Sequence, residues 1–345
     1  MKRLLYLFVT ILSLVLLAAC GGGEKEGGTS TAGTSGESGG DSSGEAKRIS
    51  IATTQTEDSH YGAYLNTFKE EVEKNSKGAI EVSLHYNSEL GNERDNVESV
   101  QFGTLDGAFI SSGVISNFVD KFNVLDFPFL FDNAEHARSV LNSEIGEEFN
   151  SSLLEIGIKN LGFGENGFRN NTNNERPIVS PEDLKGIKIR TMEVPIHQEV
   201  FSAFGASPTP MAWSEVFTSL QQGVIDGQEN PIAIIYSSKL NEVQKYVSMS
   251  GHVYSPAVFI FNNELFESFS PELQQVLLDA AKVAQQANYD FIDQNTEAQL
   301  EELKQLGMEV NEIDLKAFQD AAQPVIDKYK GDYAELYDKI KAAAK

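Results

Sequence analysis

The chain has 345 residues, 41% hydrophobic and 23% charged, which is typical of a globular protein large enough for two lobes with separate cores. Its 51 acidic and 27 basic side chains give a formal net charge of −24, which excludes nucleic acid and anionic lipid surfaces as partners. Because this charge also repels a small anion at long range, a bound anion would need local arginines.

Residues 1–19 are predicted to be a signal peptide. Lys2 and Arg3 provide its basic start, and the apolar stretch 4–17 is too short for a comfortable membrane span. The segment Leu17-Ala18-Ala19-Cys20 resembles the bacterial lipobox, and Cys20 is the only cysteine of the chain. We therefore expect cleavage before Cys20 and its acylation, with an ordinary cleavage site beside an incidental cysteine as the alternative.

Residues 20–46 are predicted to form the lipidated cysteine and a flexible linker. The linker is rich in Gly, Ser, Thr and Glu and contains almost nothing apolar. No later stretch is long and apolar enough to span a bilayer. The sequence therefore predicts an extracytoplasmic protein, lipid-anchored to the cell membrane on its periplasmic or cell-surface side.

The folded part begins near Lys47 with alternating strands and helices. Hydrophobic periodicity predicts strands at 48–53, 80–86 and 105–110, with amphipathic helices at 59–76 and 92–102 between them. This strand–helix order indicates a parallel sheet with helices on its faces.

A second unit of the same kind is predicted from Phe168 onward. The patterns predict strands at 187–190, 224–226 and 252–261, an extended segment at 207–212, and helices at 180–186, 194–204 and 214–222. Ser270-Pro271 opens a helix that runs to Gly307, long enough to lie across both lobes, and the remainder is predicted to be helical.

Signatures of enzymes and metal sites are missing from the sequence or lack their context. It has no His-Glu-x-x-His, Cys-x-x-Cys, Gly-x-Ser-x-Gly or phosphate loop. Gly162–Gly167 matches a dinucleotide pattern, but the residues that follow it are a poor helix start. The five histidines lie far apart in the sequence. We predict no enzymatic activity, no metal and no cofactor.

Two arginines are candidates for binding a carboxylate. Arg190 ends a predicted strand, where ligands of open α/β sheets bind, and Arg169 lies where the chain would cross between lobes. A guanidinium matches a carboxylate with two parallel hydrogen bonds. From the residues alone, each arginine is either such a clamp or a surface ion pair.

Three ordered segments resemble the core signature of TRAP-transporter solute-binding proteins, the DctP-like family. They are Leu184–Arg190, Gly205–Val216 and Gln221–Pro231, and Asp126–Phe131 and Glu242–Tyr246 also fit. The resemblance covers roughly residues 48–330. It implies a periplasmic-binding-protein-like α/β fold of two lobes, each a mixed sheet flanked by helices, with a long helix spanning both. We expect lobe I at 47–167 with 256–295, and lobe II at 168–255 with 296–345.

The resemblance also implies a site in the cleft between the lobes. Arg190 matches the family arginine that grips the ligand carboxylate, and the other implied contacts are Arg169, Asn230, Trp213, Glu93 and Arg94, with His60, Tyr61 and Ser111 as further first-lobe contacts. Family members that bind sialic acid carry an acid where this chain has Ser111, so sialic acid is not expected.

The implied function is delivery of a small organic acid to the membrane subunits of a TRAP permease. A C4-dicarboxylate and a sugar acid such as a uronate fit equally well. A ligand-sensing lipoprotein that presents the acid to a membrane receptor is the alternative, and a secreted hydrolase is a third reading. We expect a monomer, because assembly would hinder a cleft that opens and closes.

Overall fold

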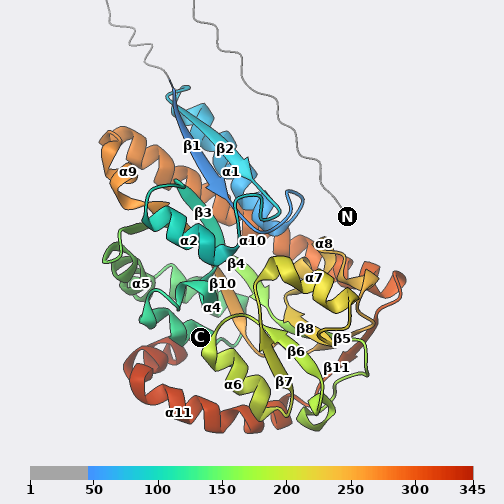
Figure 1. Cartoon of the computed structure of the whole chain (residues 1–345). Helices are drawn as coiled ribbons and strands as arrows, with labels where there is room; N and C mark the ends of the chain where they lie inside the picture. The colour runs from blue at the N-terminus through green and yellow to red at the C-terminus, as the bar shows by residue number, and fades with distance from the viewer. Residues whose placement is uncertain (1–45, 345) are drawn as a thin grey trace, which may run out of the picture. The chain divides into compact units, whose positions relative to one another are not determined.

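The computed structural model describes residues 46–344, so the predicted signal peptide, Cys20 and nearly all of the predicted linker lie outside the described residues. The described residues belong to one compact unit. Figure 1 shows this unit as two β-sheets flanked by helices. In the described part of the chain, no helix is long and apolar enough to cross a membrane.

The first sheet has five strands in the order β2-β1-β3-β10-β4. They span β1 Lys47–Ala52, β2 Ile80–His85, β3 Gly107–Ser111, β4 Ile158–Phe168 and β10 Tyr254–Asn262. As predicted, β1 pairs in parallel with both β2 and β3. The late strand β10 inserts antiparallel between β3 and β4, so the sheet is mixed.

The second sheet has six strands in the order β11-β9-β5-β8-β6-β7. They span β5 Asn170–Asn173, β6 Lys188–Thr191, β7 Ser207–Pro210, β8 Gly227–Asn230, β9 Tyr246–Met249 and β11 Glu309–Glu312. Strands β7, β6 and β8 run parallel to one another, and β5 is antiparallel to β8 and β9. The chain passes from the first sheet to the second between β4 and β5, at Arg169.

The helices cover both sheets. The α-helices are α1 His60–Asn75, α2 Glu93–Gln101, α3 Ser112–Ile115, α4 Ala134–Leu141, α5 Glu144–Leu154, α6 Pro195–Ala203, α7 Trp213–Gln221, α8 Ile232–Ser237, α9 Asn263–Ser268, α10 Pro271–Gln305 and α11 Leu315–Ala342. Three 3₁₀ turns are η1 Asp120–Asp126, η2 Pro181–Leu184 and η3 Leu240–Glu242.

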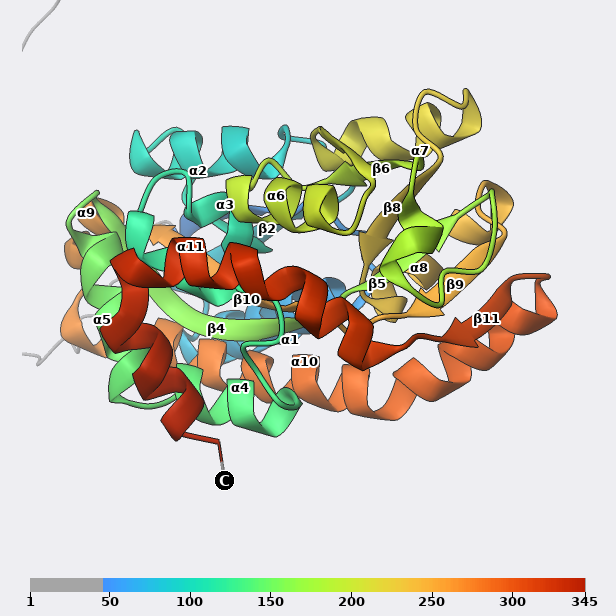
Figure 2. The same cartoon turned by 90° about the horizontal axis from the view of Figure 1, so that it is seen from below.

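Helix α10 is the long helix that the sequence predicts. Ser270 caps its start by accepting a hydrogen bond from the amide of Leu273, and Pro271 occupies the first position. It packs on helix α1 and on strand β4 of the first sheet, and on helix α8 beside the second sheet, as Figure 2 shows from below. The helix therefore connects the two halves of the unit.

Two sequence predictions at strand positions are wrong. The predicted strand 224–226 is a bend with Val224 exposed, and β8 begins one residue later, at Gly227. An added Cβ at Gly227 would lie 2.2 Å from the carbonyl oxygen of Thr172, so the pairing of β8 with β5 requires glycine there. The chain after Gly307 is not uniformly helical. Glu309–Glu312 forms β11, because Met308 and Val310 pack beside Val247 in a hydrophobic cluster before α11 begins.

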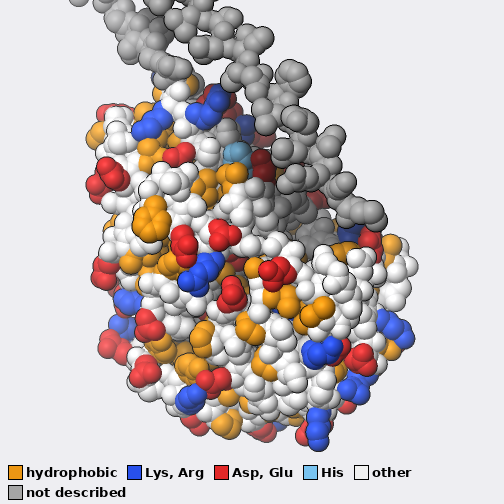
Figure 3. Space-filling view, viewed as in Figure 1, with side chains coloured by type: hydrophobic (Ala, Val, Ile, Leu, Met, Phe, Trp, Pro, Cys, Tyr) orange, Lys and Arg blue, Asp and Glu red, His pale blue; other side chains and the backbone are white. Residues whose placement is uncertain are grey.

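The hydrophobic core joins the two halves. One cluster contains Ile110 and Val258 from the first sheet together with Ile189 and Phe201 from the second half. Separate clusters lie under α1 and α10 and under α7 and α8. On the face shown in Figure 3, lysine and arginine side chains are scattered among acidic ones and do not gather into one basic patch.

Candidate ligand-binding site

The candidate site is a small cavity between the two sheets. Its lining residues are Thr54, Gln55, Glu93, Ser111, Arg169, Arg190, Met192, Trp213, Asn230 and Ile234. Ser111 ends β3 and Asn230 ends β8, while Arg190 is one residue from the end of β6. The cavity thus lies at the carboxyl ends of parallel strands from both sheets, the usual place for ligands in open α/β folds.

Arg190 presents one free guanidinium edge to this cavity. Its Nε and Nη2 donate to the carbonyl oxygen of Met211 at 3.0 and 2.8 Å. The Nε/Nη2 edge of the guanidinium is therefore occupied by the backbone. Nη1 donates to no residue of the described chain, so the Nη1/Nη2 edge is available for a carboxylate. The guanidinium lies over the Trp213 ring, with Cζ 5.7 Å from the ring centroid, a cation–π contact.

Arg190 remains charged despite its burial. The residue is 4% exposed. Burial lowers the pKa of Arg190 to about 10, and the positive charge of Arg169 acts in the same direction, while Glu229 and Glu93 oppose the shift. The guanidinium is therefore protonated at neutral pH, and it has lost most of its water.

Arg169 is paired with a buried carboxylate that the sequence analysis did not predict. Its Nη2 donates to Oε1 of Glu229 at 2.7 Å and to the backbone carbonyl of Glu229 at 2.6 Å, and Nε donates to Oε2. Burial alone would raise the pKa of Glu229, but the charge of Arg169 and a hydrogen bond with His252 hold it well below its ordinary value. Nη1 of Arg169 is buried without a partner in the described residues.

Asn230 is held by a chain of polar side chains along the second sheet. Its Nδ2 donates to Oε1 of Gln228 at 2.6 Å, and Nε2 of Gln228 donates to Oγ1 of Thr172 at 3.0 Å. All three residues are buried. This network fixes the amide of Asn230 and leaves its Oδ1 without a donor from the described residues.

Glu93 brings a carboxylate into the same cavity. Its Oε1 accepts from the backbone amide of Ser111 at 2.8 Å and from the Ser111 hydroxyl at 3.1 Å. Burial raises the pKa of Glu93, while the hydrogen bonds from Ser111 and the charges of Arg190 and Arg169 oppose that shift. Its second oxygen, Oε2, accepts from no described residue.

His60 and Tyr61 do not line the cavity but lie behind it. The Tyr61 hydroxyl is 3.4 Å from Oγ of Ser111, and Nε2 of His60 is 3.0 Å from Oδ1 of Asn166. Nδ2 of Asn166 donates to Oγ of Ser111 at 3.3 Å. These residues therefore position Ser111, and through it Glu93, instead of facing the cavity.

Arg94 points away from the main cavity. It lines a neighbouring hollow that also borders Glu93 and Arg190. Its Nε donates to Glu98 at 3.3 Å, and its guanidinium lies 5.5 Å from the Phe118 ring. The side chain is about half exposed, which favours a position at the rim.

Sequence reasoning missed several lining residues. Thr54 and Gln55 lie two and three residues after the end of β1, so the rule that ligands bind beyond carboxyl ends of strands would have identified them. Met192 and Ile234 form apolar parts of the cavity wall, and nothing in their sequence pattern distinguishes them from core residues. Among the described residues, no group of three or more His, Cys, Asp or Glu side chains could hold a metal ion.

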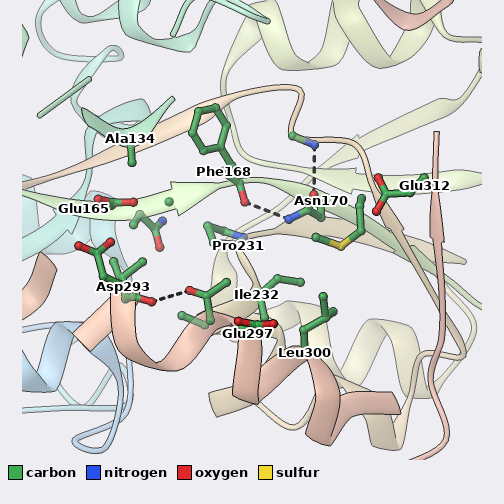
Figure 4. Close-up of a pocket in the computed structure, with 17 residues that line it drawn as sticks. Ala134, Glu165, Phe168, Asn170, Pro231, Ile232, Asp293, Glu297, Leu300 and Glu312 are labelled. Carbon is green, nitrogen blue, oxygen red and sulfur yellow. Dashed lines mark hydrogen bonds between the residues drawn. The ribbon is translucent and has the colours of Figure 1, made fainter. Parts of the chain in front are cut away.

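A larger hollow lies elsewhere, beside α10 and the β4–β5 crossing (Figure 4). It is lined by acidic Glu165, Asp293, Glu297 and Glu312 and by apolar residues such as Ile232, without a lysine or arginine. A carboxylate would be repelled there. The smaller cavity with Arg190 is therefore the better candidate for an anionic ligand.

The chain matches the family described as "DctP: Bacterial extracellular solute-binding protein, family 7" over residues 51–332. This match covers most of the chain. The protein belongs to the DctP family of TRAP-transporter solute-binding proteins.

Individual DctP-family relatives match over most of their length. A solute-binding protein of Verminephrobacter eiseniae is 44% identical over 84% of this chain and 86% of its own. The 2,3-diketo-L-gulonate-binding periplasmic protein of Escherichia coli is 35% identical over 86% of this chain and 91% of its own. These DctP-family relatives are solute-binding proteins and not enzymes, and the family acts outside the cytoplasm.

A solved DctP-family structure confirms the two-lobe fold. The TRAP periplasmic solute-binding protein of a Polaromonas species, bound to D-erythronate, is 40% identical and covers 87% of this chain and 99% of its own, with a TM-score of 0.85. The mixed α/β class, the two sheets flanked by helices and the long connecting helix of the sequence prediction are thus confirmed.

Proposed function

We propose that this protein captures a small organic acid, of the C4-dicarboxylate or sugar-acid type, and delivers it to the membrane subunits of a TRAP permease. The carboxylate would bind the Nη1/Nη2 edge of Arg190 in the cavity between the two sheets. The observation that carries this proposal is the single free guanidinium edge in a buried cavity, with its other edge closed by Met211. Similarity supports it, since the relatives named above bind 2,3-diketo-L-gulonate and D-erythronate.

Holding the ligand, and not transforming it, fits the chemistry of the cavity. Arg190 and Arg169 are donors, Glu93 and Asn230 offer acceptors, and Trp213 provides an aromatic wall. None of these five residues carries a hydroxyl or thiol nucleophile. The Ser111 hydroxyl, which also lines the cavity, donates to Glu93 at 3.1 Å. The group therefore binds an anion by hydrogen bonds and charge.

Opening and closing of the cavity would release the ligand. We divide the unit into lobe I, residues 47–167 with 256–295, and lobe II, residues 168–255 with 296–345. The chain would bend where it crosses near Arg169 and in α10, as in hinge closure around a ligand. A monomer anchored through acylated Cys20 would remain near its permease.

A binding panel tests the proposal. Purified protein is titrated by calorimetry with D-erythronate, D-galactonate, D-glucuronate, succinate and L-malate, with erythritol and D-galactose as uncharged controls. We expect saturable binding of at least one acid and no binding of the neutral polyols. Binding of the polyols with equal affinity, or of none of the acids, would overturn the proposed function. Uptake by cells that carry a TRAP permease, with and without the protein, tests delivery.

A further inference from the structure

Helix α11 crosses from the second half of the unit to the first. Figure 2 shows it running across the molecule from β11 toward α5. Its start is fixed to the second half, where the backbone amide of Asp314 donates to the carbonyl oxygen of Val179 at 2.7 Å. Further along, Lys328 donates to the carboxylate of Glu199 on α6 at 2.6 and 2.7 Å, and the Tyr329 hydroxyl donates to it at 2.7 Å. The helix is therefore held against the second half as far as Tyr329.

The final part of α11 is held against the first half instead. The Tyr333 hydroxyl donates to the carboxylate of Asp120 in η1 at 2.9 Å. Nε2 of His136 on α4 lies 2.8 Å from the backbone carbonyl oxygen of Ile340. Leu336 and Ile340 are buried in the main hydrophobic cluster. One helix thus carries two sets of anchors, one on each half of the unit.

Gly331 lies between the two anchored parts and is exposed. An added Cβ there would meet no heavy atom within 4 Å, and its φ is outside the left-handed region. Neither close packing nor the backbone conformation therefore requires glycine, although glycine in a helix interior is less stable than alanine. Pro324, which also weakens the helix, lies before Tyr329, within the part fixed to the second half. The position of Gly331 points to a conformational role.

We infer that α11 is a strap between the two lobes and that Gly331 is the residue at which it bends when the cavity opens. Tyr329 moves with lobe II and Tyr333 with lobe I, so the backbone dihedral angles between them must change. In the arrangement described here, with Arg190 4% exposed, the strap is a continuous helix, which favours the closed cavity. This inference rests on the proposed opening and closing, and it refines the proposed division, because residues 333–344 move with lobe I.

Two substitutions at Gly331 should change the ratio of closed to open protein in opposite directions. Gly331→Ala favours the continuous helix by about 0.5–1 kcal/mol, so it should raise the ratio about two- to fivefold. Gly331→Pro removes a helix hydrogen bond and clashes with the carbonyl oxygen one turn earlier, so it should lower the ratio at least about tenfold. Ser151→Ala, which raises helix propensity at an exposed position of α5 within lobe I, is the matched control and should leave the ratio unchanged.

Pulsed electron paramagnetic resonance measures this ratio without any added acid. Spin labels are attached to Glu70→Cys on α1 and Thr218→Cys on α7, which are exposed positions on different lobes. Cys20→Ser in the same full-length chain removes its only native cysteine. We expect two label separations in wild type, with populations that shift as stated.

The same ratio in wild type, Gly331→Ala and Gly331→Pro would overturn the strap. If Gly331→Pro does not fold, Gly331→Ala decides alone, because its side chain meets open space, and a ratio equal to that of wild type would overturn the inference. Since no acid is added, such a result leaves the proposed capture of an acid intact. Conversely, the expected shifts in a protein that binds none of the acids would support the strap and overturn the proposed function alone.

Discussion

Arg169 and Glu229 join the crossing strand to the second sheet through a fully buried ion pair. Arg169 follows β4, and Glu229 lies on β8, where it also accepts from His252 at 3.2 Å. The pair holds the guanidinium of Arg169 at the cavity while cancelling its charge. It therefore shapes the site and leaves Arg190 as the cation available to the ligand.

Breaking this pair on one side should destabilise the fold strongly. Glu229→Gln leaves the Arg169 charge buried without compensation, so the free energy of unfolding should fall by about 3–5 kcal/mol. The double variant Arg169→Met with Glu229→Leu should recover most of that loss, because no buried charge remains. Urea unfolding monitored by circular dichroism measures both. The exposed pair Arg48–Glu81 is the control, and Arg48→Ala should cost at most about 1 kcal/mol. A loss in Glu229→Gln no larger than in this control would contradict the account.

Buried His60 should make the protein sensitive to mild acid. Burial lowers the pKa of His60 to about 4, and its hydrogen bond with Asn166 opposes the shift. Below pH 6.5 the unfolded chain binds a proton that native His60 does not bind until about pH 4. The free energy of unfolding therefore suffers no loss from His60 above pH 6.5, and it falls as the pH drops from 6.5 toward 4.

Unfolding in urea at pH 6.5 and pH 5 checks this window. Wild type should lose about 2 kcal/mol more than His60→Gln between the two pH values. Buried His252, whose pKa is also lowered by burial, contributes equally to both proteins and cancels in the comparison. If His60→Gln and wild type lose the same free energy of unfolding between these pH values, the proposal that native His60 is buried and neutral is wrong.

Gly227 should be intolerant of any side chain. The Cβ of Gly227→Ala would lie 2.2 Å from the backbone oxygen of Thr172 on the neighbouring strand. Relief requires moving β8, so we expect a loss of about 2–3 kcal/mol or more in stability. Ligand affinity should fall as well, because β8 carries Asn230. Gly331→Ala, within α11 and with open space around it, should stabilise by about 0.5–1 kcal/mol. Thermal unfolding and calorimetry distinguish the two, and a neutral Gly227→Ala would refute the steric argument.

The lipid anchor is tested on Cys20, which lies outside the described residues. If Cys20 is acylated, its acyl chains hold the protein at the membrane, since each buried CH₂ contributes roughly 0.8 kcal/mol. Cys20→Ala should therefore move the protein from the membrane fraction to the soluble extracellular or periplasmic fraction. Fractionation followed by immunoblotting measures this, with Ser30→Ala in the linker as the control. Retention of Cys20→Ala in the membrane fraction would exclude the anchor.

The sequence predicted the hydrophobic elements of the fold well. The amphipathic pattern of 59–76 and the alternation of 80–86 correspond to α1 and β2 almost to the residue, because each buries one face on a regular period. The parallel pairing of β1, β2 and β3 followed from the same pattern. The antiparallel insertion of β10 was not predicted by any local pattern, since it depends on contacts between residues far apart in the chain.

The polar strands were missed for a physical reason. Asn170–Asn173 and Gly227–Asn230 contain hardly any apolar side chain, yet every residue in both strands is buried. Backbone pairing between β5 and β8 and the side-chain hydrogen bonds of Thr172, Gln228 and Asn230 hold them, so no hydrophobic pattern marks them in the sequence. Gly162–Gly167 likewise lies within β4 and is followed by β5, so it is not the loop before a helix that a dinucleotide site requires.

The site was partly predictable. Arg190 was identified because it ends a predicted strand, and Asn230 through the resemblance to the DctP-like family; the structure places both at one cavity. Glu229 lies in the same family motif as Asn230, but a carboxylate that neutralises Arg169 is recognised only from their contact in space. For the same reason His60 and Tyr61 were predicted as contacts, whereas they lie one layer behind Ser111.

The most direct test of the account is the affinity of Arg190→Ala for the acid that wild type binds most tightly, measured by calorimetry. Loss of the charged, bidentate contact should weaken binding about 100-fold, while the exposed Arg48→Ala binds as wild type does. Arg190→Lys should not restore affinity fully, because an ammonium lacks the planar fork. If Arg190→Ala binds the acid as tightly as Arg48→Ala, Arg190 does not hold the carboxylate and the proposed site is wrong.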